Sequence, residues 1–118
     1  MIDLNGLCAA TLANAELRQK NGGHIKSDTR SMLKHCATEV VEAAEAYLEL
    51  EMYKSQWDDD AWLDIPADKP RMAFASELAD IICCVLIIAG KEGIDIEQAI
   101  SACVEKNRKR AEGTGDKL

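Results

Sequence analysis

Hydrophobic residues recur with helical spacing in two stretches of the N-terminal half. In residues 4–20 apolar side chains return every three or four positions, and the "NGG" of residues 21–23 ends the pattern. Residues 27–29 are all good N-cap types, and they precede an apolar stripe that runs to about Tyr53. Each stretch therefore predicts one amphipathic helix.

Two further helical patterns lie in the C-terminal half. One follows Pro70, contains the unbroken apolar run 81–89, and runs to about Glu92 before Gly93 stops it. The other opens at Asp95 with a pattern close to a capping box and continues to about residue 110. No strand-like alternation or internal repeat is present. We therefore predict an all-α fold, a four- to five-helix bundle in one domain covering residues 1–118.

A long polar connection joins the second and third patterns. Residues 54–70 hold both tryptophans, both prolines and a "DDD" stretch, and one short helical turn is predicted near Trp62. A connection of this length is unusual in a compact domain. It is either a functional loop or a solvated segment.

Composition and charge narrow the functional classes. The chain is 47% hydrophobic and 4% aromatic, which suits packed helices, and its net charge of −7 argues against nonspecific nucleic-acid binding. The longest apolar run is about half of the ~20 residues that a membrane span needs, and the N-terminus does not resemble a signal peptide. The five cysteines are odd in number and form no CxxC. We therefore expect a cytoplasmic protein with reduced cysteines that binds neither nucleic acid nor membrane.

Two carboxylate pairs stand inside apolar stretches. Glu39 and Glu42 lie three residues apart in the second helix, and Glu77 and Asp80 do so in the third. Either pair alone would usually be a solvated helix face. If the two helices pack antiparallel, however, the four groups converge, and they must then take up protons or hold cations.

The ligand types indicate which cation would bind. Carboxylates alone suit Mg²⁺, with Mn²⁺ possible, whereas zinc prefers histidine or cysteine. A di-iron site would need Glu-x-x-His, and neither His24 nor His35 stands three residues after a glutamate. Because Mg²⁺ keeps positions open for phosphate oxygens, we expect a phosphate-bearing substrate.

The last helix ends in a basic run that has two interpretations. "EKNRKR" contains Lys106, Asn107 and Arg110, and it complements the dipole of any helix that ends there. Beside a cation held by carboxylates, the same residues could bind phosphate oxygens.

These motifs resemble those of the MazG-like all-α nucleoside triphosphate pyrophosphohydrolases, over residues 33–110. That superfamily includes dCTP pyrophosphatases, dimeric dUTPases and phosphoribosyl-ATP pyrophosphohydrolases. The shared pattern is an ExxE helix, an ExxD helix, a GID turn and a helix ending in N-x-x-R. Here its parts are residues 39–42, 77–80, 93–95 and 107–110. Their order and spacing together carry the resemblance.

The resemblance implies a function and roles for individual residues. It implies that Glu39, Glu42, Glu77 and Asp80 are the catalytic residues that bind Mg²⁺. It further implies that Asn107 and Arg110 contact the substrate, a nucleoside triphosphate hydrolysed to monophosphate and pyrophosphate. Lys106 is a further candidate for substrate binding. Family members form dimers or tetramers, so the resemblance also implies a homo-oligomer, with the nucleotide site near an interface.

Two positions depart from the family pattern. MazG proper has EExxE, and Thr38 stands in place of its first glutamate. Many relatives have a lysine four residues before the asparagine, where this chain has Cys103, and Lys106 could compensate. Both departures favour the alternative of a noncatalytic nucleotide-binding or partner-binding module. A phosphoribosyl-ATP pyrophosphohydrolase is a third possibility.

Overall fold

The part of the chain that the structure describes contains four helices. The structure is a computed structural model, and it describes residues 3–57 and 68–113. Within these residues it contains no strand, which confirms the predicted all-α class. The helices are α1 (Leu4–Lys20), α2 (Thr29–Trp57), α3 (Asp68–Glu92) and α4 (Ile96–Ala111).

The helix ends lie close to the predicted ones. α1 has the predicted bounds, whereas α2 continues past Tyr53 to Trp57. α3 begins two residues before Pro70, which is possible because proline lacks only an N–H that the first helical turn leaves unbonded. The helical turn predicted near Trp62 lies outside the described residues.

The turn between α3 and α4 is built as its sequence predicts. Gly93 adopts a φ of +66°, a conformation that glycine reaches without steric cost, and the Ile94 N–H donates to the Ala89 carbonyl at 2.9 Å. Asp95 then caps α4, because its Oδ1 accepts from the backbone N–H of Gln98 at 3.1 Å. These local bonds fix where α3 ends and α4 begins.

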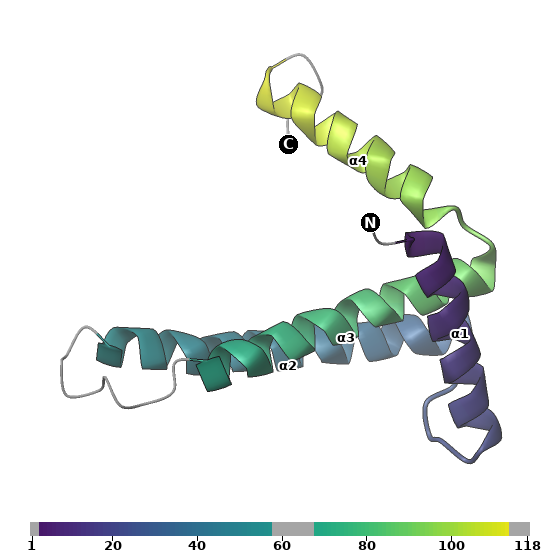
Figure 1. The fold of residues 1–118 in the computed structure, drawn as a ribbon, viewed down its shortest axis with the longest axis horizontal. Helices are drawn as coiled ribbons and strands as arrows, with labels where there is room; N and C mark the ends of the chain where they lie inside the picture. The colour runs from purple at the N-terminus through teal and green to yellow at the C-terminus, as the bar shows by residue number, and fades with distance from the viewer. Residues whose placement is uncertain (1–2, 58–67, 114–118) are drawn as a thin grey trace.

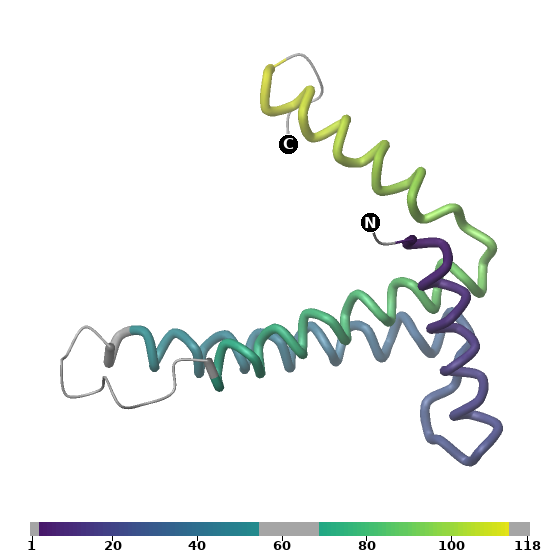
Figure 2. The backbone as a smooth tube through the Cα atoms, viewed as in Figure 1, coloured from purple at the N-terminus to yellow at the C-terminus, as the bar shows by residue number. Residues whose placement is uncertain are grey.

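α2 and α3 form a long antiparallel pair, and α1 crosses α3 near its C-terminal end (Figure 1, Figure 2). Gly90 permits this crossing, because a Cβ at that position would lie 3.2 Å from the Cys8 carbonyl oxygen. The Thr29 hydroxyl donates to Glu92 Oε2 at 2.8 Å and ties the start of α2 to the end of α3. The antiparallel pairing places the middle of α2 beside the middle of α3.

The buried core lies where α1 meets this pair. One buried cluster joins α1, α2 and α3, and a second joins α1 and α3, with Ile96 of α4 packed against it. The clusters consist of Ala15, Met32, Cys84 and Ile87, and of Cys8, Leu86 and Ala89. Four of these seven residues are alanine or cysteine, and no large side chain of the described residues is below 2% exposed, so one chain buries little apolar surface.

Much of the apolar surface of the described chain faces solvent. On α3, Leu78, Ile82 and Val85 form an exposed stripe at helical spacing. Beyond its first turn, α4 extends away from α2 and α3 (Figure 1). The Cα radius of gyration is 18.2 Å, against about 13.5 Å for a compact domain of this length. A single copy therefore does not close into a compact bundle.

α3 is also long and apolar enough, over Lys69–Glu92, to cross a membrane by length and composition alone. The central helix of a water-soluble protein passes the same test. α3 packs against both α1 and α2 and carries Glu77 and Asp80 on its surface. The expectation that the protein does not bind membranes therefore stays a prediction.

Candidate functional site

Three glutamates from the two paired helices come together midway along the pair. Glu39 and Glu42 lie one turn apart on α2, and Glu77 lies opposite them on α3. One carboxylate oxygen of each lies within 4.8 Å of the others, a spacing at which all three could contact one ion. The convergence predicted for antiparallel helices is thus present for these three residues.

The cluster contains carboxylate oxygens that lack a partner. Glu39 is buried, and its Oε1 lies 2.8 Å from His35 Nε2, a contact that is an ion pair when the imidazole is protonated. Its other oxygen, Oε2, is buried and has no hydrogen-bond partner within the described chain, and Glu77 Oε2 is in the same situation. Buried oxygens without a donor are costly, so the arrangement favours a bound proton or cation.

Burial and the neighbouring negative charges raise the pKa of two of the three glutamates. Burial raises the pKa of Glu39 above its usual value, the nearby Glu42 carboxylate adds to the rise, and His35 partly offsets it. Burial, Glu42 and Asp80 together raise the pKa of Glu77. The predicted behaviour of crowded carboxylates is therefore found at both residues.

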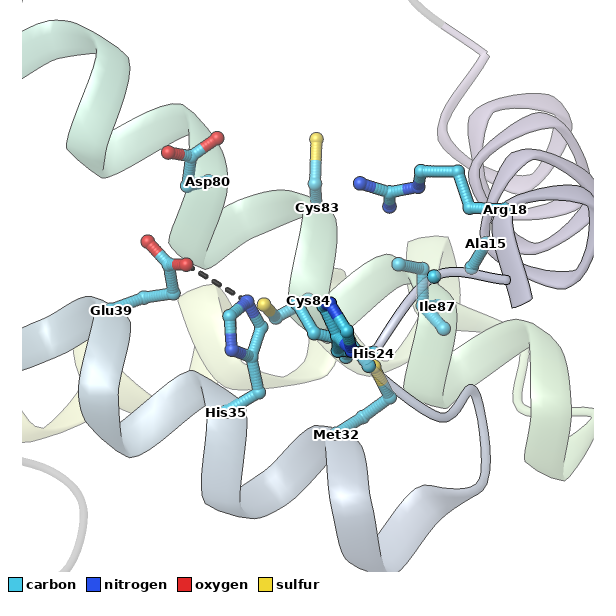
Figure 3. A pocket seen from close by; sticks show the side chains of 12 residues that line it. Ala15, Arg18, His24, Met32, His35, Glu39, Asp80, Cys83, Cys84 and Ile87 are labelled. Atoms are coloured by element: carbon cyan, nitrogen blue, oxygen red, sulfur yellow. Dashed lines mark ion pairs between the residues drawn. The ribbon is translucent and has the colours of Figure 1, made fainter. Parts of the chain in front are cut away.

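Asp80 lies beside the cluster and outside the group of three. It is exposed on α3, and Figure 3 shows its carboxylate facing the Glu39 carboxylate across a short gap. Its charge contributes to the raised pKa of both Glu39 and Glu77. Asp80 therefore adds negative charge beside the cluster, on the side of the pocket, without being one of the three converging carboxylates.

A pocket of about 450 Å³ adjoins the carboxylates. Glu39 and Asp80 stand at its α2–α3 end, and its walls extend along α3 to Ile87 and across to α1 (Figure 3). Its polar lining includes Arg18, His24 and His35, and its apolar lining includes Ala15, Met32, Cys84 and Ile87. A mostly apolar cavity with a few placed polar groups is typical of small-molecule sites.

The thiols beside the carboxylates are poor cation ligands. Burial raises the pKa of Cys84 to about 11, so its thiol stays protonated near neutral pH. All five cysteines are free, and the cluster of three consists of glutamates alone. The donor set is therefore one of hard oxygen atoms, which fits Mg²⁺ or Mn²⁺.

The basic residues of α4 do not join this site within one chain. Lys106 and Asn107 are exposed, and Arg110 is half-buried with an Nε that lacks a hydrogen-bond partner in the described chain. They lie in the part of α4 that extends away from α2 and α3 (Figure 1). Their predicted contact with substrate stays a prediction, and it requires a second copy or a movement of α4.

The two departures from the sequence pattern also have a structural setting. Thr38 is exposed, and its hydroxyl donates to the Lys34 carbonyl of its own helix at 3.4 Å, so the hydroxyl is not a fourth member of the cluster. Cys103 is exposed on α4, and its sulfur lies 3.7 Å from Asn107 Nδ2. Neither residue replaces the charge of the missing side chain.

The sequence did not predict the three basic side chains that line the pocket, Arg18, His24 and His35. His35 stands four residues before Glu39, and this i, i+4 spacing could have identified the pair. Arg18 could not have been found in this way, because α1 reaches the pocket only through its tertiary crossing of α3. In Figure 3 its guanidinium extends across the pocket toward Cys83.

A known protein family matches the part of the chain that contains the carboxylate cluster. Residues 27–114 match the model of the MazG nucleotide pyrophosphohydrolase domain, and this range includes the whole carboxylate cluster. Neither curated proteins nor solved structures gave a match. Since the matched domain covers most of the chain and is all-α like the fold described above, the protein belongs to the MazG nucleotide pyrophosphohydrolase family.

Proposed function

We propose that this protein hydrolyses a (deoxy)nucleoside triphosphate to the nucleoside monophosphate and pyrophosphate, in a reaction that requires Mg²⁺ or Mn²⁺. The observation that carries the proposal is the cluster of Glu39, Glu42 and Glu77, with two buried oxygens that lack a donor, inside a MazG-family domain. Such an enzyme would serve the upkeep of the nucleotide pool.

Each carboxylate has a stated role in this proposal. Glu39, Glu42 and Glu77 would hold the cation with the oxygens that converge, and Asp80 would complete the ligand set from the pocket side. The cation supplies positive charge that offsets the charge of the triphosphate and of the departing pyrophosphate. The contact with His35 would hold Glu39 through its Oε1, which leaves Oε2 free for the cation.

The charge of the site makes the cation obligatory. Four carboxylates lie at or beside one end of the pocket, and their negative charge would repel a triphosphate. Few positive side chains line that end to offset this charge. In this scheme no side chain of the protein forms a covalent bond with the substrate, since positioning and charge stabilisation suffice for phosphoryl transfer. Activity should therefore disappear completely when divalent cations are chelated.

A nucleotide panel with product analysis tests the proposal. Pyrophosphate and monophosphate are the expected products, and inorganic phosphate without pyrophosphate would indicate an ordinary phosphatase. Glu39→Gln, Glu42→Gln, Glu77→Gln and Asp80→Asn should each lower turnover by about a hundredfold or more, because each removes one ligand charge. Glu45→Gln is the matched control on α2, because it removes the same charge one turn beyond the motif and should have a much smaller effect.

The same panel distinguishes two alternatives. Nucleotide binding without turnover of any common or damaged nucleotide would support a noncatalytic module, which Thr38 and Cys103 favour. Turnover confined to phosphoribosyl-ATP would identify a phosphoribosyl-ATP pyrophosphohydrolase.

We also propose that the protein functions as a homo-oligomer, a dimer or a tetramer. The exposed stripe of Leu78, Ile82 and Val85 and the isolated position of α4 support this proposal, because burying both would stabilise the fold by the hydrophobic effect. In such an assembly, α4 of one copy would bring Lys106, Asn107 and Arg110 to the carboxylates of another. The free cysteines and the net charge of −7 support a cytoplasmic protein that does not bind nucleic acid.

A further inference from the structure

The pocket beside the carboxylates has a definite direction. Along α3, its lining advances from Asp80 through Cys83 and Cys84 to Ile87. Asp80 and Ile87 are seven positions apart, which corresponds to about 10 Å along the helix. The carboxylates thus stand at one end, and α1 and the α1–α2 connection form the other (Figure 3). A nucleotide with its phosphates at the cation would extend its base toward α1.

The α1 end of the pocket is apolar except for a few side chains. Ala15, Met32 and Ile87 belong to the buried core and supply a surface on which a flat base can rest. Arg18 comes from the last turn of α1 and reaches over this surface, as Figure 3 shows. Hence a base in the pocket would meet the Arg18 guanidinium at its edge.

Arg18 is free to make such a contact. Its guanidinium has no hydrogen bond or ion pair within the described residues. A guanidinium offers five N–H donors and no acceptor, so it can pair only with acceptor atoms. The strong side-chain acceptors of the pocket, Glu39 and Asp80, lie at the opposite end, where the cation would engage them.

We propose that Arg18 determines the base preference of this site by donating to carbonyl oxygens of the base. The inference rests on the proposed nucleotide hydrolysis and names its substrate class: nucleotides of 6-oxopurines and 4-oxopyrimidines, such as guanine, uracil and thymine. Guanine offers O6 and N7 to one guanidinium, and uracil and thymine offer O4. Adenine and cytosine carry an amino group at the corresponding position. The amino group and the Arg18 guanidinium are both hydrogen-bond donors, so neither can accept from the other.

The test compares nucleotides whose bases carry either an oxygen or an amino group at this position. Wild-type protein should show a higher kcat/KM for GTP than for ATP and for UTP than for CTP, each by roughly fivefold to tenfold. This is the lower part of the range for a bidentate base contact, because Arg18 is exposed. Arg18→Ala should abolish the preference, and Arg18→Gln should move it toward ATP, because an amide donates and accepts at once.

Lys20→Ala is the matched control. Lys20 lies in the same last turn of α1, has the same charge and does not line the pocket. Its loss should leave the base preference unchanged. If Arg18→Ala instead lowers kcat/KM equally for all four nucleotides, Arg18 binds phosphate and the proposal is wrong. A wild-type preference for ATP and CTP would overturn it as well.

A binding measurement separates this inference from the proposed hydrolysis. Titration calorimetry with the uncharged nucleosides guanosine, adenosine, uridine and cytidine in EDTA requires neither turnover nor a divalent cation, and it avoids repulsion between a phosphate and the carboxylates. Tighter binding of guanosine and uridine, lost in Arg18→Ala, would support the inference even in a protein without turnover. Equal binding of all four, with triphosphate hydrolysis intact, would overturn the inference and leave the proposed function standing.

Discussion

His35 Nε2 lies 2.8 Å from Glu39 Oε1, one turn earlier on the same helix. The contact fixes one oxygen of a buried carboxylate and leaves the other, Oε2, without a donor inside the cluster of three glutamates. It therefore sets which oxygen faces the proposed cation. Partners of this kind commonly orient the ligands of a metal site.

The first prediction follows from that contact. His35→Ala should weaken Mn²⁺ binding by about tenfold to a hundredfold, because Glu39 loses the contact that orients it. Titration of free Mn²⁺ by electron paramagnetic resonance measures the affinity. His35→Gln, which retains an N–H donor, should recover part of the loss. Lys34→Ala on the preceding, exposed position is the control, and an unchanged affinity in His35→Ala would refute the role of the histidine.

A second prediction concerns metal and stability. Mg²⁺ should raise the free energy of unfolding by about 2.7 kcal/mol at a hundredfold excess over its dissociation constant. The reason is that the cation binds the converged glutamates of the folded state and finds no such site in the unfolded chain. Thermal melts with Mg²⁺ and with EDTA measure the effect. Glu77→Gln should remove most of it, and a melting temperature indifferent to Mg²⁺ in wild-type protein would contradict the site.

The pH dependence of the metal-free protein gives a third prediction. Burial, Glu42 and Asp80 raise the pKa of Glu77 in the folded state. The folded protein therefore binds this proton more tightly than the unfolded chain does. This difference in proton affinity stabilises the fold fully below the unfolded pKa of about 4.3, and the stabilisation is lost as pH rises through the folded pKa. In EDTA, Glu77→Gln should stabilise the protein relative to wild type at pH 7.5.

The comparison between two pH values makes this prediction specific. The stabilising effect of Glu77→Gln should shrink toward pH 4.5, where wild-type Glu77 becomes protonated. Asp28, Asp95 and Glu105 have pKa values held below their usual range by hydrogen bonds, so their contributions fall at low pH in both proteins. These contributions are the same in wild type and in Glu77→Gln, so they cancel when the stabilities of the two proteins are subtracted. An equal difference at pH 4.5 and pH 7.5 would show that Glu77 is not crowded by like charges.

Assembly is the subject of a fourth prediction. Ile82 is 55% exposed in the middle of the stripe on α3. Ile82→Asp should dissociate the oligomer, because a carboxylate in an apolar interface loses its hydration without gaining a partner. Light scattering at micromolar concentration measures the mass. A wild-type particle of 12.9 kDa, the mass of one chain, would exclude the oligomer. Arg71→Asp, at an exposed charged position of the same helix outside the stripe, is the control.

A fifth prediction tests whether the site is shared between copies. Glu77→Gln should be inactive, and a variant with alanine at Lys106, Asn107 and Arg110 should bind substrate poorly. If α4 of one copy serves the carboxylates of another, mixing the two variants should restore activity, because some mixed sites contain only intact residues. Mixing Glu39→Gln with Glu77→Gln should restore none, since both changes lie on the same carboxylate cluster. Absence of recovery in the first mixture would place each site within one chain.

The sequence by itself determined the helices, their ends and the chemistry of the acidic residues. Apolar periodicity, the glycine at 93 and the Asp95 cap are local features, and each acts through the backbone within a few residues. The ExxE and ExxD spacings also follow from helical geometry alone, so each pair could be placed on one face without a structure. For the same reason, the His35–Glu39 pair was within reach of the sequence.

Only the tertiary structure decided which residues meet across helices. The register of α2 against α3 brings Glu77 to Glu39 and Glu42 and leaves Asp80 beside them, and a shift of one turn would have changed that set. The crossing of α1 over Gly90 brings Arg18 to the pocket, and the direction of α4 takes Arg110 away from it. These outcomes depend on packing between segments far apart in the chain. Periodicity along a single helix contains no information about such packing.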